Sequence, residues 1–329
     1  MQEALKRILK AVFEPMFYDE MMGFRPNRNC HMALRKLNWM EYTNYVLDAD
    51  IKGFFDHLDH EWIIRFVESR IKDPNIIRLI RVMLKAGIMK DYVFEVTEEG
   101  SGQGAVCSPI LANIYMHYVL VWWFKEWQKR NARGYCGLVV YADDFVVCFQ
   151  YKDDAERFYK QLGDRMERFG LSLEKAKSRL IEFGRFAESN RECQKEGKPE
   201  TFTFLGFTHY CSHSRYGKFR VKRKTSKKKF NKKAKEMDRE IKERLLILGI
   251  RVPELIKWAN QVLVGHFHYY GITDNCKSLV RFVDRIKKSL LKWLNRRSQR
   301  RSFNWDNFKD LMKDFPLARP KIYVSIYGN

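Results

Sequence analysis

Two adjacent aspartates, Asp143 and Asp144, are the residues of this chain whose type and setting point most directly to chemistry. β-Branched and aromatic runs flank them at residues 137–141 and 145–149. This pattern is typical of a β-hairpin that carries both carboxylates at its tip. Neighbouring carboxylates repel each other and lose solvation beside a sheet core, and a divalent cation would compensate for both. A lone Asp-Asp pair is more often an exposed turn, but the hydrophobic runs on both sides favour a metal site.

A two-metal site for phosphoryl transfer needs a third carboxylate, which must come from another strand. The segment 45–56 contains a second group of acids next to β-forming residues. Read with a period of two, one face carries Leu47, Ala49 and Ile51, and the other carries Val46, Asp48 and Asp50. The acids of this predicted strand therefore gather on one face.

Together with Tyr141-Ala142-Asp143-Asp144, the segment around Asp50 resembles the palm of reverse transcriptases. Nearly the whole chain is similar to the group II intron-encoded reverse transcriptase/maturase family. This resemblance implies that Asp50, Asp143 and Asp144 are the catalytic residues and bind two Mg²⁺ ions. It implies an α+β fold of the right-hand polymerase type, with fingers and palm around a β-hairpin active site and an α-helical thumb. The expected domains are 1–215, partial fingers and palm, and 216–329, a helical and basic thumb or maturase (X) domain.

The resemblance also implies residues that contact the nucleotide and the primer. The nucleotide-binding residues are Ile51, Phe55, Gln103 and Lys177, and the primer grip contains Leu205 and Gly206. An aromatic wall at Phe55 would clash with a 2′-hydroxyl and so favour deoxynucleotides. Taken alone, Phe55 would be assigned to the core, and Lys177 to the solvated surface.

Basic residues form the expected nucleic-acid surface. Arg25 and Arg28, in a loop that resembles the second finger block, either contact phosphate or form salt bridges at a surface. Residues 218–235 contain eleven Lys and Arg and no acid, a run that is often solvated or disordered. Because it lies between the palm and a helical segment, we expect it to grip a phosphate backbone through Lys222, Arg223, Lys224, Lys227, Lys228 and Lys229.

Composition is consistent with a nucleic-acid partner. The 62 Lys and Arg against 40 Asp and Glu give a net charge of +22, which favours a polyanion. We find neither a run of eighteen apolar residues nor the apolar core of a signal peptide, so we expect a cytoplasmic protein without a membrane partner. The seven cysteines are odd in number and form no Cys-x-x-Cys motif, which favours reduced thiols.

Two functions remain open from the sequence. The first is an RNA-directed DNA polymerase with maturase activity, whose partners are an RNA template, intron RNA, a DNA or RNA primer and dNTPs. The second is an RNA-binding maturase or splicing cofactor that has lost polymerisation. The first finger blocks and the C-terminal endonuclease of the family have no counterpart in this sequence. Either the chain is a fragment, or a second polypeptide supplies the fingers, or polymerisation has been abandoned.

Overall fold

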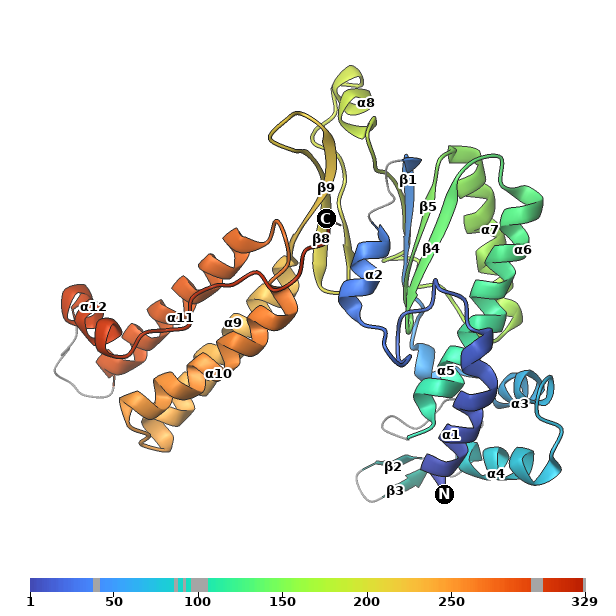
Figure 1. Ribbon diagram of the computed structural model, residues 1–329, viewed down its shortest axis with the longest axis horizontal. Coiled ribbons are helices and arrows are strands. Elements are labelled where there is room, and N and C mark those ends of the chain that lie inside the picture. Colours follow the sequence, from blue (N-terminus) through green and yellow to red (C-terminus); the bar gives the residue numbers. More distant parts are fainter. Residues whose placement is uncertain (38–41, 86–87, 91–92, 96–105, 297–303, 328–329) are drawn as a thin grey trace. The chain divides into compact units, whose positions relative to one another are not determined.

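The computed structural model describes residues 1–37, 42–85, 88–90, 93–95, 106–296 and 304–327 (Figure 1), with only the backbone described at 88–90 and 93–95. The chain divides into two compact units. Unit 1 consists of Met1–Leu205 and Cys211–Val221, and unit 2 of Gly206–Tyr210 and Lys222–Asn329. Within the described residues, none of the helices combines the length and apolar character needed to cross a lipid bilayer.

Unit 1 mixes helices and strands. Its α-helices are α1 (Gln2–Phe13), α2 (Cys30–Lys36), α3 (His60–Glu68), α4 (Pro74–Lys85), α5 (Ser108–Met116), α6 (Trp122–Asn131), α7 (Lys152–Arg168) and α8 (Ala187–Cys193). Short 3-10 turns form at η1 (Glu14–Met16) and η3 (Phe54–Asp56), and the π-helical turn η4 (His117–Val121) joins α5 to α6. Its strands are β1 (Tyr45–Ala49), β2 (Ile88–Lys90), β3 (Val93–Glu95), β4 (Cys136–Tyr141), β5 (Asp144–Phe149), β6 (Arg179–Glu182) and β7 (Phe202–Phe204).

A four-stranded antiparallel sheet with the order β4-β5-β1-β6 is the scaffold of unit 1. Helix α7 packs against β1, β5 and β6, and Figure 1 shows α6 beside it. The Phe158 ring on α7 lies 5.0 Å from Trp127 and 5.4 Å from Phe149, measured between ring centroids. This aromatic cluster fixes the helices against the sheet, since large buried rings contribute much of the energy of a core.

Strand β1 alternates as its sequence predicts. Leu47 is 0 % exposed, Ala49 5 % and Ile51 3 %, and all three join the main core of unit 1. Asp48 and Asp50 occupy the alternate positions. The period of two therefore places the acids of this strand on the face opposite the core.

Unit 2 is mainly helical. Its helices are α9 (Lys227–Lys242), the π-helical turn η5 (Glu243–Ile247), α10 (Val252–Tyr270), α11 (Cys276–Arg296) and α12 (Trp305–Asp314). Strands β8 (Phe207–His213) and β9 (Phe219–Thr225) pair beside β7, and each contributes residues to both units. The predicted α+β class is confirmed by this mixture of sheet and helix.

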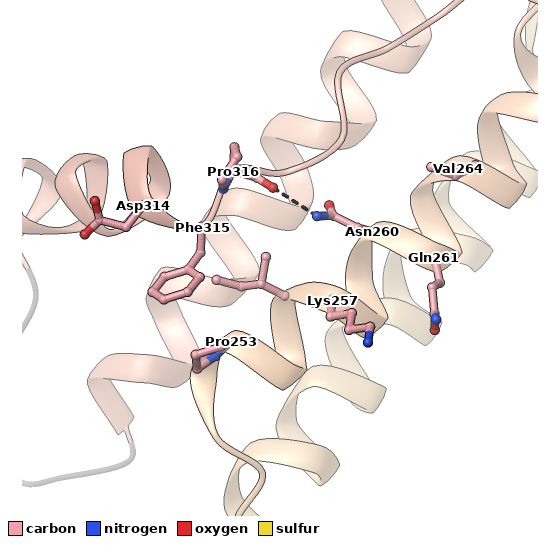
Figure 2. Close-up of a pocket in the computed structure, with 9 residues that line it drawn as sticks. Pro253, Lys257, Asn260, Gln261, Val264, Asp314, Phe315 and Pro316 are labelled. Carbon is pink, nitrogen blue, oxygen red and sulfur yellow. Dashed lines mark hydrogen bonds between the residues drawn. The ribbon is translucent and has the colours of Figure 1, made fainter.

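Hydrogen bonds from buried or half-buried polar side chains tie the elements of unit 2 together. Asp238 of α9 accepts hydrogen bonds from the Ser289 hydroxyl at 2.6 Å and the Trp293 indole N–H at 3.0 Å, both on α11. Asn275, 0 % exposed, accepts from the Thr225 backbone N–H and donates to the Thr225 hydroxyl, both at 2.8 Å. Figure 2 shows Asn260 of α10 donating to the Pro316 carbonyl beside a largely apolar groove. Each of these bonds satisfies a polar group that would be costly to leave unpaired.

Candidate active site

The two adjacent aspartates lie at a tight hairpin, as predicted. Strand β4 pairs with β5 up to Tyr141 opposite Asp144, so Ala142 and Asp143 form a two-residue turn. Ala142 has a φ of +59°, the left-handed value that such primed turns require at their first central position. Glycine is usual there, because a side chain at positive φ is strained by about 1–2 kcal/mol. The surrounding structure therefore holds this turn against local strain.

The segment before α2 supplies that support. The Met22 N–H donates to the Val140 carbonyl at 2.8 Å, and the Val140 N–H donates to the Glu20 carbonyl at 2.9 Å. Gly23 lies directly against the turn, and its carbonyl accepts a hydrogen bond from the buried Asn113 amide of α5 at 2.9 Å. The hairpin that carries Asp143 and Asp144 is thus hydrogen-bonded to a loop that is itself held by a helix.

Asp50 lies at the same end of the sheet as the hairpin tip. Ala49 of β1 pairs with Phe145 of β5, so Asp50 and Asp144 are the next residues at that end of their strands. The Asp50 backbone is fixed because its N–H donates to the Ser178 hydroxyl at 3.3 Å and its carbonyl accepts from the Glu174 N–H at 2.8 Å. Strand register and this loop thus place the three predicted carboxylates at the same end of the sheet.

The environment of Asp143, including the charge of Asp50, raises the pKa of its carboxyl group. Burial raises the pKa of Asp143, a hydrogen bond to its own backbone N–H opposes that rise, and the negative charge of Asp50 adds to it. Burial and the charge of Asp50 both destabilise the ionised carboxylate of Asp143, and a nearby positive charge would stabilise it.

Lys177 is the cation that the structure places at this site. Its ammonium lies 2.7 Å from the Asp50 carboxylate, and the hydrogen bond and charge of Asp50 raise the pKa of Lys177. A turn in which the N–H groups of Lys177 and Ser178 both donate to the Glu174 carbonyl carries the lysine to Asp50. Lys177 was predicted to lie near the nucleotide, and its place beside a predicted catalytic carboxylate is compatible with that prediction.

Asp48 is a fourth carboxyl group near the site, and it was not among the predicted site residues. Burial raises the pKa of Asp48 to about 6; Arg179, 3.8 Å away on β6, opposes the rise, and the charges of Asp144 and Asp50 add to it. The signal was present in the sequence, because the period of two puts Asp48 on the face of Asp50. What the sequence lacked was the pairing of β1 with β6, which sets Asp48 opposite Arg179.

The chemistry of these side chains fits magnesium. In the part of the chain that the structure describes, no three His, Cys, Asp or Glu side chains converge closely enough to hold a metal ion by themselves. Mg²⁺ is usually held by one or two carboxylates together with substrate phosphates and water, so a complete protein cage is not required. The hard oxygens of Asp50, Asp143 and Asp144 are ligands of the right type.

The predicted nucleotide contacts are placed in part. Phe55 is half-buried in η3, with its ring centroid 5.3 Å from Phe54 and 6.5 Å from Phe24. Phe24, 47 % exposed, is a neighbour that the sequence did not indicate. The Ile51 side chain is buried, and its backbone forms an isolated antiparallel bridge with Leu173. Gln103 lies outside the described residues.

The predicted primer grip is a tight turn between β7 and β8. Leu205 has a φ of +49° and Gly206 a φ of +77°. A Cβ at position 206 would lie 3.0 Å from the Tyr270 hydroxyl, so glycine serves both the backbone conformation and the close approach.

Arg25 and Arg28, two of the predicted nucleic-acid contacts, form salt bridges within the protein. Arg25 has a side chain that is 7 % exposed; it bonds Glu14 at 2.8 Å and donates to the Tyr18 and Met21 carbonyls. Arg28 pairs with Asp19 at 2.6 Å. Of the two roles left open for these arginines, the structure places both in salt bridges.

Side chains of β9 alternate between buried and more exposed positions, so the basic residues of this strand differ in their exposure. Arg223 is 0 % exposed, and burial lowers its pKa while nearby Tyr327 and Asp274 oppose that change. The prediction that Arg223 contacts phosphate at the surface is therefore wrong. Lys224 is exposed, with its ammonium 5.1 Å from the Tyr210 ring centroid, and Lys222 is half-buried. The lysines at 227, 228 and 229 are exposed at the start of α9, so these five remain candidates.

Comparisons with known proteins agree with this geometry. A model of the family "Reverse transcriptase (RNA-dependent DNA polymerase)" matches residues 1–209, and one of "Group II intron, maturase-specific domain" matches residues 234–311. Group II intron-encoded protein LtrA of Lactococcus lactis subsp. cremoris is 42% identical over 118 residues, which cover 35% of this chain and 20% of LtrA. Protein YkfC of Escherichia coli (strain K12) is 26% identical over 259 residues, which cover 67% of this chain and 62% of YkfC. The chain thus spans less than two thirds of either relative.

Among solved structures, apo telomerase from Candida Tropicalis matches 94% of this chain and 56% of its own, with a TM-score of 0.50 and 12% identity. At that identity the likeness concerns the fold alone, which is that of a reverse transcriptase polymerase. Since the first family model covers more than half of the residues and the second covers most of the helical remainder, the chain belongs to the reverse transcriptase family and carries a group II intron maturase domain.

Proposed function

We propose that this protein is an RNA-directed DNA polymerase of the group II intron type, which extends a primer on an RNA template and also binds intron RNA to assist splicing. The observation that carries the proposal is that Asp50, Asp143 and Asp144 all lie at the same end of adjacent antiparallel strands. Negative charge is concentrated there enough for Asp50 to raise the pKa of Asp143. A site of this kind suits cations and phosphates in a two-metal phosphoryl transfer.

In this proposal, Asp50, Asp143 and Asp144 hold two Mg²⁺ ions. When bound, these ions supply a lowered pKa for the primer 3′-hydroxyl and stabilise charge on the transferred phosphoryl group. The chain's own residues position the reactants. The hairpin fixes Asp143 and Asp144, and the loop at Glu174–Ser178 fixes the Asp50 backbone.

Lys177 and Phe55 select and orient the nucleotide in this proposal. The Lys177 side chain is 64 % exposed, so it can exchange Asp50 for a triphosphate at small energetic cost. Phe55 packs on Phe54 and Phe24, which keeps its ring in place as a wall against a 2′-hydroxyl. The substrates are accordingly dNTPs, with a DNA or RNA primer.

Intron RNA is the second partner in this proposal. The match of residues 234–311 to a maturase-specific domain and the exposed lysines at the start of α9 support it. The alternative, a maturase without polymerase activity, would keep the RNA-binding surface and need none of the three aspartates. Their retention favours the enzyme.

Primer extension tests the proposal. The chain is incubated with an RNA template, a DNA primer, dNTPs and Mg²⁺, and binding to structured RNA is measured in parallel. Mg²⁺-dependent extension on the RNA template is the expected result. Tight RNA binding with no extension at any Mg²⁺ concentration would overturn the polymerase assignment in favour of the maturase alone.

A further inference from the structure

A cavity between α11 and α12 lies within the helical unit and outside the predicted polymerase site. Its volume is about 580 Å³. It is lined by Asp284, Lys287, Lys288, Trp305, Phe308, Lys309, Met312 and Lys313. The lining thus combines three apolar or aromatic side chains with four lysines and one acid.

Trp305 is the unusual member of this lining, because its side chain is 49 % exposed. It stands at the first position of α12, where Asn304 caps the helix by accepting hydrogen bonds from the N–H groups of Asp306 and Asn307. The buried Phe308 ring meets it edge-on, with centroids 5.9 Å apart and planes at 82°. The indole is therefore held on a capped helix and a fixed ring while much of its surface stays open to a ligand.

The four lysines of the lining differ in whether they already form an ion pair. Lys309 and Lys313 are paired with Asp306 and Asp310 at 2.9 and 2.8 Å. Lys287 and Lys288 of α11 form no ion pair with any described residue. Their charges are thus available for an anion that approaches the cavity from α11.

The basic surface continues beyond the cavity. Lys288 also lines a second cavity of about 230 Å³ between α9 and α11, with the cations Lys235, Arg239, Arg285 and Lys292. The acid in that second cavity, Asp238, is occupied by Ser289, Trp293 and Lys292. A row of cations therefore continues along α11 from Lys288, with Arg285, Lys288 and Lys292 spaced by the helix repeat.

We propose that the α11–α12 cavity binds one unstacked base of a structured RNA, stacked on Trp305, with the adjoining phosphates on Lys287 and Lys288. This inference rests on the proposed RNA-binding function and names the feature recognised, an unpaired or bulged nucleotide. Sequence-tolerant stacking on an aromatic ring next to basic residues is how unpaired RNA is commonly bound. A peptide of acidic residues alone would satisfy the lysines but has no ring to place on the open indole.

The test compares three short RNA hairpins of the same stem: fully paired, with one bulged adenosine, and with an abasic residue at the bulge. Trp305→Ala should weaken binding of the bulged RNA about tenfold, as expected for the loss of one base stack, and change binding of the other two RNAs little. Trp305→Phe should restore most of the preference. Tyr216→Ala is the matched control, because Tyr216 is an exposed aromatic residue (91 %) outside this cavity.

Lys287→Ala with Lys288→Ala should weaken binding of all three RNAs and flatten the dependence on salt, since it removes phosphate contacts and leaves the stack. Equal losses on all three RNAs for Trp305→Ala, or no loss on any, would overturn the inference. The inference would also be overturned if poly-glutamate displaced the bulged RNA from the wild-type protein but not from the Trp305→Ala variant. Primer extension at saturating template should be unchanged in Trp305→Ala. Bulge-selective binding without any extension by the wild type would refute the polymerase and leave this inference standing.

Discussion

Replacement of Gly23 by alanine should displace the hairpin that carries Asp143 and Asp144. A Cβ at position 23 would lie 2.4 Å from the Ala142 backbone nitrogen and 3.0 Å from the Tyr141 carbonyl carbon, whereas ordinary contact begins at 3.4 Å. Both neighbours are backbone atoms, so no side chain can rotate away. The loop is also held in place, by Asn113 on the Gly23 carbonyl and by Met22 on the Val140 carbonyl.

The magnitude follows from this geometry. Relief of the clash requires a shift of about 1 Å, and misplacement of a catalytic group by that distance lowers a rate by about 10²-fold. Over-packing of this kind also lowers the free energy of unfolding by about 1–3 kcal/mol. We therefore expect a much slower chemical step in a protein that still folds and still binds RNA.

Single-turnover primer extension at saturating template, together with thermal unfolding, measures both effects. Gly163→Ala is the matched control, because a Cβ at position 163 of α7 would meet nothing within 4 Å, and alanine favours a helix by about 0.5–1 kcal/mol. The control should extend primers normally and unfold at the same or a higher temperature. A wild-type rate and melting temperature for Gly23→Ala would refute the view that this loop positions the hairpin.

Three further perturbations test other parts of the structure. Phe55→Ala should admit ribonucleotides more readily, because the proposed wall against the 2′-hydroxyl is removed; unchanged discrimination in single-nucleotide incorporation would contradict that role. Neutralising the five surface lysines should flatten the slope of log affinity against log salt by up to about 4.5, at roughly 0.9 per phosphate contact, and an unchanged slope would show them to be bystanders. The five are Lys222, Lys224, Lys227, Lys228 and Lys229. Burial, with smaller contributions from Arg25 and Arg70, lowers the pKa of His117 to about 4. The unfolded chain therefore binds more protons than the folded chain between about pH 4 and 6.5. The free energy of unfolding should fall by up to about 3 kcal/mol as the pH drops through that window. Unfolding of wild type and His117→Phe at several pH values checks this, and an equal pH dependence in both would exclude His117 as the cause.

The local patterns of the sequence predicted the strand and the hairpin that carry Asp50, Asp143 and Asp144. Alternation in residues 45–51 and the runs around Asp143 define a strand and a hairpin from short-range order alone. The strand and the hairpin are brought together by the pairing of β1 with β5, whose partner residues lie about a hundred positions apart in the chain. The family resemblance supplied this pairing, and the periodicity did not.

The remaining features depend on contacts between distant segments. The importance of Gly23 appears only when its loop is seen against Ala142, and Phe24 is recognised only beside Phe55. Arg223 was wrongly predicted to contact phosphate, because the prediction considered its charge and not its position in the strand. Val221 and Thr225, which lie on the same face of β9, are buried with it. Its neighbours Asp274 and Tyr327 lie far along the chain, so no local pattern indicated that a buried arginine would be accommodated there.

The central claim is that the three aspartates form a polymerase site, and Asp143→Asn tests it most directly. The substitution keeps the shape of the side chain and removes one charge that burial and Asp50 already disfavour, so folding should be preserved. The measurement is Mg²⁺-dependent dNTP incorporation on an RNA template under single-turnover conditions, with RNA affinity determined on the same samples. We predict that incorporation falls to background while RNA affinity stays the same or rises slightly, because a negative charge near phosphate is lost. Incorporation at close to the wild-type rate would contradict the account.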